Sequence, residues 1–381
     1  MPGVVIVGAG QGGFQVAASL RSEGYAESIA LIGDEPHLPY QRPPLSKEFL
    51  LGKYPIEKAD LRPPTFFEQQ RIDLVTGQQV TDIDRGQRRV RLQSGDSIEY
   101  SKLVLATGAR VRKLPIDGAL YLRGRDDAIV LRQRLESAQS IAVVGGGFIG
   151  LEVAAAARTL GKRVTVIEAQ PRLMARVVAP LISDFYRDLH TQRGVEIQFG
   201  EGLIPPADLV VVGIGVIPND DLARAAGLAT ANGIAVDAYL RTSDENIYAI
   251  GDCAEFDNPF AGDRVRLESV QNAVDQAKCA AANIAGHQQP YHAVPWFWTH
   301  QFDVILQMAG LSAGADRAIS RGDPAGGKFS VFYFRGEALK GVDSINRPAD
   351  HMAGRKLLAS ETSLTPDQAA DLAVDLKSFL V

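Results

Sequence analysis

The sequence predicts an α/β protein in which one strand–turn–helix–strand unit occurs twice and a smaller α+β domain follows. Two observations support this fold class. The glycine pattern of residues 5–14, "VIVGAGQGGF", returns in residues 143–152, "VVGGGFIGLE", and the composition becomes richer in aromatic residues after about residue 290. The 381 residues suffice for two or three domains of about 100–200 residues each.

The first unit covers roughly the first 35 residues. Residues 3–10 form a continuous apolar run that ends in glycine, which is typical of a parallel strand buried on both faces. Apolar residues at helical spacing follow and predict a helix that stops at Gly24. The next strand, residues 28–35, closes on Asp34 and Glu35.

The second unit repeats this order. It consists of the strand "SIAVVGGG", the helix "FIGLEVAAAARTLGK" and the strand "RVTVIEAQ", which contains Glu168. Further strands are predicted at 102–109, 207–215 and 246–252, each with a glycine or an acid in its last two residues. Beyond residue 290, "PWFWTHQFDVILQMAGL" and "KFSVFYFRGEALKGVDSIN" predict antiparallel strands, and "PADHMAGRKLLAS" predicts a helix.

Both glycine turns match the pattern GxGxxG of dinucleotide-binding units. The first glycine permits the tight turn, the second lets the backbone approach a pyrophosphate, and the third lets helix and strand pack closely. The phosphates then lie at a helix N-terminus, where free N–H groups favour negative charge. The three positions are filled by Gly8, Gly10 and Gly13, and again by Gly145, Gly147 and Gly150. Two tight turns without a ligand are the alternative.

The acid that follows each turn bears on the choice of nucleotide. A carboxylate at the end of the second strand hydrogen-bonds the ribose hydroxyls, whereas a 2′-phosphate needs a cation at that place. Glu168 is followed by Ala169 and Gln170, and the nearest cation is Arg172. The sequence therefore favours NADH over NADPH in the second unit.

Composition excludes several functional classes. The net charge of −5 argues against nucleic acid as the main partner, and no apolar run is long enough for a membrane span or follows a basic leader. The two cysteines, Cys253 and Cys279, form neither a disulfide framework nor a CxxC metal site, so they are expected to be small buried residues. We expect a cytoplasmic protein without a metal.

The whole chain resembles the FAD-dependent, NADH-using ferredoxin reductases of bacterial cytochrome P450 and ring-hydroxylating dioxygenase systems. The segments that carry the resemblance include "VGAGQGGFQVAASLR", "YQRPPLSK", "LVLATGAR", "VVGGGFIGLEVAA", "AIGDCAEF", "ESVQNA", "PWFW" and "FSVFYF". Of these, "YQRPPLSK" and "ESVQNA" are not general to flavoproteins. The resemblance implies a glutathione-reductase-like fold with two Rossmann-type domains and a C-terminal α+β domain.

In this family the first unit binds FAD tightly, and the second binds NADH, which exchanges. The implied FAD contacts are Gly8, Gly10, Gly12, Gly13, Asp34 or Glu35, Arg42, Lys47, Val80, Arg123, Asp252 at the ribityl chain and Val270 at the flavin ring. The implied NADH contacts are Gly145, Gly147, Ile149, Gly150 and Glu168. For Arg42 and Lys47, a solvated loop is the alternative.

Lys47, Glu152 and Trp298 are the residues that the resemblance places closest to the chemistry. Glu152 would lie near the nicotinamide, but an acid early in a helix also compensates the helix dipole. Trp298 would lie near the flavin or the electron exit, and the alternative is a core tryptophan of the C-terminal domain.

The absence of a cysteine before Cys253 indicates how electrons leave. Disulfide reductases of this fold use an early cysteine, whereas the comparable loop here carries Ser46. The flavin is then the last redox group, and it passes electrons singly to a [2Fe-2S] ferredoxin. Such a ferredoxin is acidic, so Lys278, Arg317 and Arg321 are candidate docking residues, although each can be an ordinary surface cation.

The predicted domains are an FAD domain of residues 1–110 and 234–290, an NADH domain of 111–233 and a C-terminal domain of 291–381. The leading function is NADH:ferredoxin reductase. The alternatives are an NADH oxidase or peroxide-reducing flavoenzyme, and a signalling flavoprotein of the apoptosis-inducing-factor type.

Two segments depart from the family pattern. Only "EGLIPP" separates "VEIQFG" from "ADLVVVGIG", where relatives have a longer β-hairpin, so either the hairpin is deleted or residues are missing. His300 stands where relatives commonly have an acid.

Overall fold

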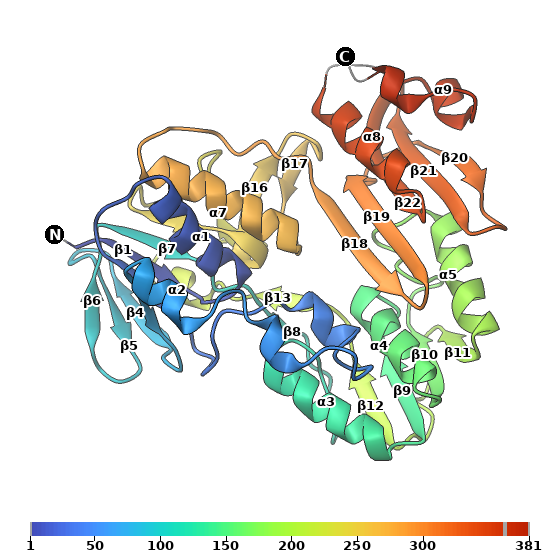
Figure 1. Ribbon diagram of the computed structural model, residues 1–381, viewed down its shortest axis with the longest axis horizontal. Coiled ribbons are helices and arrows are strands. Elements are labelled where there is room, and N and C mark those ends of the chain that lie inside the picture. Colours follow the sequence, from blue (N-terminus) through green and yellow to red (C-terminus); the bar gives the residue numbers. More distant parts are fainter. Residues whose placement is uncertain (1, 361–363, 380–381) are drawn as a thin grey trace. The chain divides into compact units, whose positions relative to one another are not determined.

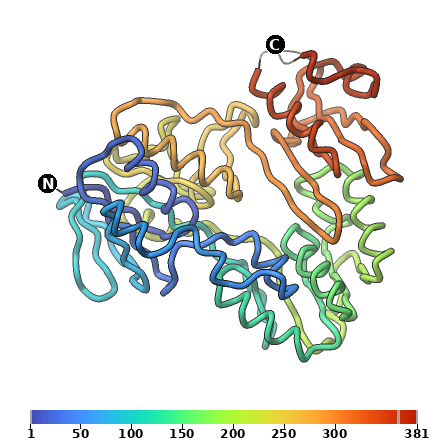
Figure 2. Tube along the Cα trace, viewed as in Figure 1, coloured from blue at the N-terminus to red at the C-terminus, as the bar shows by residue number. Residues whose placement is uncertain are grey.

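The computed structural model describes residues 2–360 and 364–379, which divide into two compact units. The first unit contains residues 1–41, 59–110 and 217–293, and the second contains 42–58, 111–216 and 294–381. Each unit therefore joins stretches that are far apart in the sequence, as the colours of the chain trace show (Figure 2). Two short strands, β8 (Ala109–Val111) and β13 (Val216–Pro218), pair with each other.

The first unit is built on a parallel five-stranded sheet in the order β15-β7-β1-β2-β3. Its strands are β1 (Val4–Val7), β2 (Ile29–Ile32), β3 (Ile72–Val75), β7 (Lys102–Leu105) and β15 (Ile247–Ala249). The strands are rich in Val, Ile and Leu because helices or loops cover both faces of such a sheet. Helices α1 (Gln11–Ser22) and α7 (Val270–Ile284) pack side by side (Figure 1).

Smaller elements complete the first unit. They are an antiparallel sheet of β4 (Val80–Asp84), β5 (Arg89–Leu92) and β6 (Ser97–Glu99), a sheet of β14 (Ile234–Ala235), β16 (Ala254–Asn258) and β17 (Asp263–Val265), the helices α2 (Pro64–Gln69) and α6 (Asp221–Ala225), and a 3-10 turn, η3 (Gly251–Cys253). The segment predicted as a strand at 246–252 is thus a short strand followed by this turn.

The second unit contains the repeated strand–turn–helix–strand pattern, as predicted. Its parallel sheet has the order β11-β10-β9-β12. The elements are α3 (Arg125–Ser137), β9 (Ser140–Val144), α4 (Phe148–Thr159), β10 (Arg163–Glu168), α5 (Pro180–Gln192), β11 (Val195–Phe199) and β12 (Leu209–Val212). A 3-10 turn, η1 (Pro43–Ser46), packs against α3 and α4 of the same unit.

The connection from β11 to β12 is short but long enough to join the two strands. The chain leaves β11 at one edge of the sheet and enters β12 at the other, three strand spacings of about 4.8 Å away and one strand length back. Residues 200–208 reach at most about 30 Å when extended, which suffices for this path of roughly 20 Å. They contain no helix or strand, and Leu203 is 94% exposed.

An antiparallel sheet in the order β18-β19-β22-β21-β20 follows, as the aromatic-rich C-terminal segments predicted. Its strands are β18 (Trp296–Gln301), β19 (Val304–Gly310), β20 (Arg317–Asp323), β21 (Lys328–Arg335) and β22 (Ala338–Ile345). Helices α8 (Pro348–Ala359) and α9 (Pro366–Ala370) pack on it around a core that contains Phe332, Phe334 and Leu357.

Candidate functional site

The two glycine turns have the same backbone geometry. Gly8 and Gly145 both have φ +109°, and a Cβ on either would lie 2.2–2.4 Å from a backbone oxygen. A side chain at either position would therefore collide with the neighbouring strand. The sharp turn out of β1 and β9 requires glycine at both positions.

The third glycine of each pattern lets the helix pack on its own strand. A Cβ on Gly13 would lie 1.9 Å from the carbonyl oxygen of Gly8, and a Cβ on Gly150 would lie 2.1 Å from that of Gly145. These contacts confirm the packing role predicted from the sequence.

The second glycine of each pattern faces open space. Gly10 and Gly147 are the N-caps of α1 and α4, and a Cβ on either would meet no protein atom within 4 Å. Neither helix has an acid in its first turn. Each turn thus presents free backbone N–H groups at the positive end of a helix, next to space for a ligand, and this fits the pyrophosphate of a dinucleotide.

Glu168 completes the second turn. It ends β10 at the level of Gly145, and its carboxylate oxygens accept hydrogen bonds from the N–H groups of Gly146 and Gln170, each at 2.7 Å. A Cβ on Gly146 would lie 3.1 Å from Glu168 and 2.7 Å from Leu173, so the acid needs a glycine opposite it. A carboxylate has about four acceptor sites, which leaves two for ribose hydroxyls.

The first unit differs at the equivalent position. β2 ends at Ile32, so the strand predicted to close on Asp34 and Glu35 is shorter. Gly33 stands level with Gly8, where the second unit has its glutamate. A Cβ on Gly33 would lie 2.6 Å from that of the neighbouring alanine of the turn. The alanine thus takes the space that the second unit gives to its acid.

The acids of the first unit therefore come later in the chain than Glu168 does. Asp34 is exposed, whereas Glu35 accepts a hydrogen bond of 2.6 Å from the hydroxyl of Tyr40. Both side chains follow the carboxyl end of β2, the edge of a parallel sheet at which dinucleotides bind.

The remaining predicted contacts are divided between the two units. Gly12, Val80, Asp252 and Val270 belong to the first unit, at α1, β4, η3 and the start of α7. Arg42, Lys47, Arg123, Ile149, Glu152 and Trp298 belong to the second. Within it the structure brings Arg42 to Arg123, whose carbonyl oxygen accepts a 2.6 Å hydrogen bond from the Arg42 guanidinium.

Lys47 and Glu152 form a salt bridge of 2.7 Å in the second unit. Glu152 is 3% exposed and stands beyond the first turn of α4, so the interpretation as an acid that compensates the helix dipole is wrong. Its carboxylate also accepts hydrogen bonds from Ser46, at 2.5 Å, and from Thr299, at 2.7 Å. The sequence analysis did not assign these hydroxyls to the site, because their partner is more than 100 residues away.

Trp298 is partly exposed and stacks on Trp296, with ring centroids 5.4 Å apart and an interplanar angle of 29°. The guanidinium of Arg355 lies 4.7 Å from the Trp296 ring. A fully buried core tryptophan is therefore not what the structure shows.

Cys253 is buried, as predicted, whereas Cys279 is only partly buried. Cys253 is fully buried, and burial raises the pKa of its thiol. Burial also raises the pKa of the Cys279 thiol to about 11. Neither thiol is prepared to act as a nucleophile at neutral pH.

One predicted docking residue is excluded. Arg321 is 5% exposed, and its guanidinium donates to the carbonyl oxygens of Ala369, Asp371 and Val374. It is a structural residue of the C-terminal part, so its assignment to ferredoxin docking is wrong.

Arg317 and Lys278, the other two candidates, remain at the surface. Arg317 is paired with Glu337 at 2.8 Å. Lys278 keeps 60% of its side chain exposed and has a long contact of 3.8 Å with Asp275.

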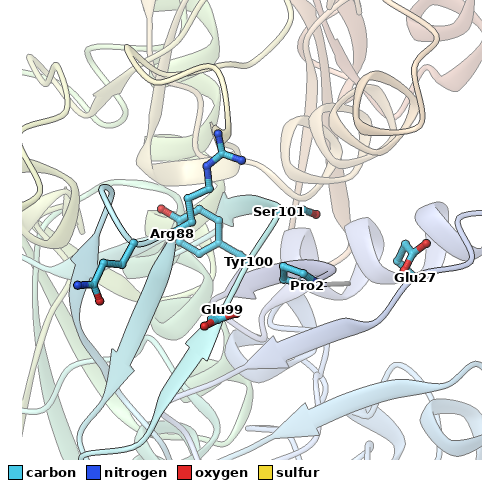
Figure 3. Close-up of a pocket in the computed structure, with 7 residues that line it drawn as sticks. Pro2, Glu27, Arg88, Glu99, Tyr100 and Ser101 are labelled. Atoms are coloured by element: carbon cyan, nitrogen blue, oxygen red, sulfur yellow. The ribbon is translucent and has the colours of Figure 1, made fainter.

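A surface pocket of about 450 Å³ lies in the first unit (Figure 3). Its lining includes Pro2, which precedes β1, and Ser101, which precedes β7. It therefore lies at the amino ends of parallel strands, opposite the edge where Gly8 begins the glycine turn. We do not assign a cofactor to this pocket.

Residues 2–360 and 364–379 contain neither a cluster of metal ligands nor a membrane-spanning helix. No group of three or more His, Cys, Asp or Glu side chains among them could hold a metal ion. Within the same residues, no helix has the length and apolar character needed to span a membrane.

Comparison with known proteins defines the family. The family described as "Pyridine nucleotide-disulphide oxidoreductase" matches residues 2–204 and 200–277, and the one described as "Reductase C-terminal" matches residues 296–380. The first match divides within the short connection between β11 and β12.

Individual relatives cover nearly the whole chain. Rhodocoxin reductase of Rhodococcus erythropolis is 50% identical over 398 aligned positions, with 98% of this chain and 93% of the relative covered. The crystal structure of the ferredoxin reductase for the CYP199A2 system of Rhodopseudomonas palustris is 48% identical, with a TM-score of 0.96 and complete coverage of both chains.

A third similar structure is that of the covalent putidaredoxin reductase–putidaredoxin complex. It is 40% identical and has a TM-score of 0.96. The similarity covers 100% of this chain and 98% of that chain. With these similarities and the two glycine turns, the chain belongs to the pyridine nucleotide-disulphide oxidoreductase family and, within it, to the ferredoxin reductases.

Proposed function

We propose that the protein is an FAD-containing, NADH-dependent ferredoxin reductase that supplies a cytochrome P450 or a ring-hydroxylating dioxygenase. The observation that carries this proposal is the pair of glycine turns with matching geometry, each with open space at the N-terminus of a long helix. One turn suits a resident dinucleotide and the other a visiting one. When both are bound, NADH supplies a hydride and FAD accepts it and passes on single electrons.

The first turn, at Gly10, holds the FAD pyrophosphate, and Asp34 or Glu35 takes the ribose. The second turn, at Gly147, holds the pyrophosphate of NADH, which exchanges. Ile149 supports the second assignment because it is exposed in the first turn of α4, beside the open face of Gly147.

The hydrogen bonds around Glu168 support NADH as the nucleotide. Its carboxylate is held by two backbone N–H groups and still has acceptor capacity for ribose hydroxyls. Arg172, the nearest cation after it, is occupied elsewhere. Its terminal nitrogens donate to the carbonyl oxygens of Val178 and Ala175 and to the hydroxyl of Ser183. It is therefore not available for a 2′-phosphate.

The surroundings of Ser46 support direct electron transfer from the flavin. Ser46 is buried and its hydroxyl donates to Glu152, so this loop supplies no thiol. Cys253 and Cys279 lie elsewhere, and neither thiol is activated. These features disfavour a peroxide-reducing flavoenzyme, which needs a reactive cysteine.

The electron acceptor that we propose is a [2Fe-2S] ferredoxin. Support comes from the similar structure in which a reductase of this kind is joined to putidaredoxin. Lys278 is the cation that we retain for docking, because its ammonium is largely exposed and its contact with Asp275 is long.

Reduction of cytochrome c by NADH, measured with and without a [2Fe-2S] ferredoxin, tests this function. We expect a rate that depends on the ferredoxin concentration and is much lower with NADPH. Turnover of peroxide together with no effect of ferredoxin would contradict the proposal. A rate with NADPH equal to that with NADH would contradict only the role of Glu168.

A further inference from the structure

The buried carboxylate of Glu152 collects donors from separate segments of the second unit. Lys47 and Ser46, from the loop at η1, both approach Oε2, at 2.7 and 2.5 Å. Thr299, from β18, donates to Oε1 at 2.7 Å. Lys47 keeps 14% of its side chain exposed and Glu152 keeps 2%. The pair is therefore largely buried, and the Lys47 ammonium also donates to the carbonyl oxygen of Pro43 at 3.2 Å.

A chain of hydrogen bonds continues from Thr299 into the interior. Gln301 lies two residues further along β18, on the same face of the strand, and its Nε2 lies 3.3 Å from the Thr299 hydroxyl. Behind it, the Gln301 Oε1 lies 2.8 Å from Nε2 of His190 on α5. All three side chains are fully buried, so these hydrogen bonds are shielded from bulk solvent.

The chemistry of the groups fixes the direction of every bond. Gln301 Oε1 can only accept, so Nε2 of His190 carries the proton and donates. The Gln301 amide nitrogen can only donate, so the Thr299 oxygen accepts and its own hydrogen points to Glu152. Burial lowers the pKa of His190 to about 4, which keeps the imidazole neutral at physiological pH. The three hydrogen bonds therefore run in one direction: His190 donates to Gln301, Gln301 donates to Thr299, and Thr299 donates to the Glu152 carboxylate.

We propose that Thr299, Gln301 and His190 are positioning residues that hold the Glu152 carboxylate against Lys47 and thereby set the rate of hydride transfer from NADH. This inference rests on the proposed function, in which α4 binds the pyrophosphate at Gly147. Glu152 lies five residues beyond Gly147 on that helix, a rise of about 7.5 Å, and it is a residue that the resemblance to the ferredoxin reductases places near the nicotinamide.

The expected effect of removing the Thr299 hydroxyl follows from the number of hydrogen-bond donors to the Glu152 carboxylate. Without the Thr299 hydroxyl, Oε1 of Glu152 loses the donor from β18, and the carboxylate is held only at Oε2, by Ser46 and Lys47, so that its plane can turn about that oxygen. A misplacement of about 1 Å at a reacting group can cost up to about 100-fold in rate. The glycine turn and Glu168 remain intact, so NADH binding should change little.

A purely structural role is the competing explanation, because α4 also packs on β18 through Phe148 and Phe297, whose ring centroids are 4.7 Å apart. Such a role would lower stability without separating the rate of hydride transfer from the affinity for NADH.

The test compares Thr299→Val with Thr299→Ser in the FAD-loaded protein by anaerobic stopped-flow reduction of the flavin with NADH. We expect Thr299→Val to lower the limiting rate by about 10-fold or more, with the NADH dissociation constant within about twofold of the parent. Thr299→Ser should restore the rate. Thr159→Val is the matched control, because the Thr159 hydroxyl, on the same helix as Glu152, donates to the carbonyl oxygen of Ala155 within that helix.

A double substitution tests whether Gln301 acts on Glu152 through Thr299. Since Gln301 acts through Thr299, Gln301→Leu should slow the parent but add little to Thr299→Val. Should Gln301→Leu fail to fold, the two Thr299 variants still decide the question.

Provided that NADH reduces the flavin of the parent protein, an unchanged limiting rate in Thr299→Val, or no rescue by Thr299→Ser, would overturn the inference. If the parent itself is not reduced by NADH, the proposed function fails instead.

Discussion

Replacing Gly147 by alanine separates ligand binding from folding in the second glycine turn. A Cβ at this position meets no protein atom within 4 Å, and the backbone φ of −82° is accessible to any residue. We therefore expect Gly147→Ala to change the free energy of unfolding of the protein without NADH by no more than about 1 kcal/mol.

The same methyl group would occupy the space at the N-terminus of α4 that we assign to the pyrophosphate. The minimum cost is one hydrogen bond between a backbone N–H and a charged oxygen, which is worth about 1.5–3 kcal/mol. This corresponds to an increase of about 10- to 150-fold in the dissociation constant for NADH. Titration of the FAD-loaded protein with NADH, together with thermal unfolding, measures both quantities.

Gly150→Ala, unlike Gly147→Ala, should lower the stability of the protein. Its Cβ would lie 2.1 Å from the carbonyl oxygen of Gly145, so the helix must move off its strand, at a cost of about 1–3 kcal/mol or more in stability. Gly202→Ala is the control, because a Cβ there also meets nothing within 4 Å but lies in the loop after β11. Normal NADH affinity in Gly147→Ala would refute the assignment of this turn.

Three further results are expected. Gly10→Ala should weaken retention of FAD during gel filtration by at least about 10-fold while the chain still folds, because its Cβ also faces open space. Burial raises the pKa of Asp343 to about 7, so the stability from its proton is present below about pH 4 and is lost as the pH rises to 7. Asp343→Asn should flatten this part of the pH profile of unfolding, by up to about 4 kcal/mol in denaturant titrations. Arg321→Met should destabilise the protein by about 3 kcal/mol without changing the KM for ferredoxin, because the guanidinium holds carbonyl groups rather than a partner.

The features that the sequence predicted well are those determined by local spacing. The glycine turns, the helices after them and the individual C-terminal strands are each predicted by a pattern within a short window of about 11–18 residues. Such patterns report backbone geometry directly. The same approach misjudged the end of β2, where Gly33 replaces an acid, because only the register of the strands shows which residue stands level with Gly8.

The features that could not be predicted depend on distant partners. Arg321 is buried because its guanidinium meets carbonyl groups about 50 residues further along the chain. Ser46 and Thr299 reach Glu152 across 106 and 147 residues. The sequence next to a hydroxyl or an arginine does not indicate such a distant partner, so only the tertiary structure identifies the partners of these residues.

Transfer of electrons from the reduced flavin to a ferredoxin is the most direct test of the account as a whole. The FAD-loaded protein is reduced with one equivalent of NADH without oxygen and then mixed with oxidised [2Fe-2S] ferredoxin. We predict that the oxidised flavin spectrum returns and that two ferredoxins are reduced for each flavin. A flavin that stays reduced in the presence of ferredoxin and is reoxidised only by oxygen or peroxide would contradict the account.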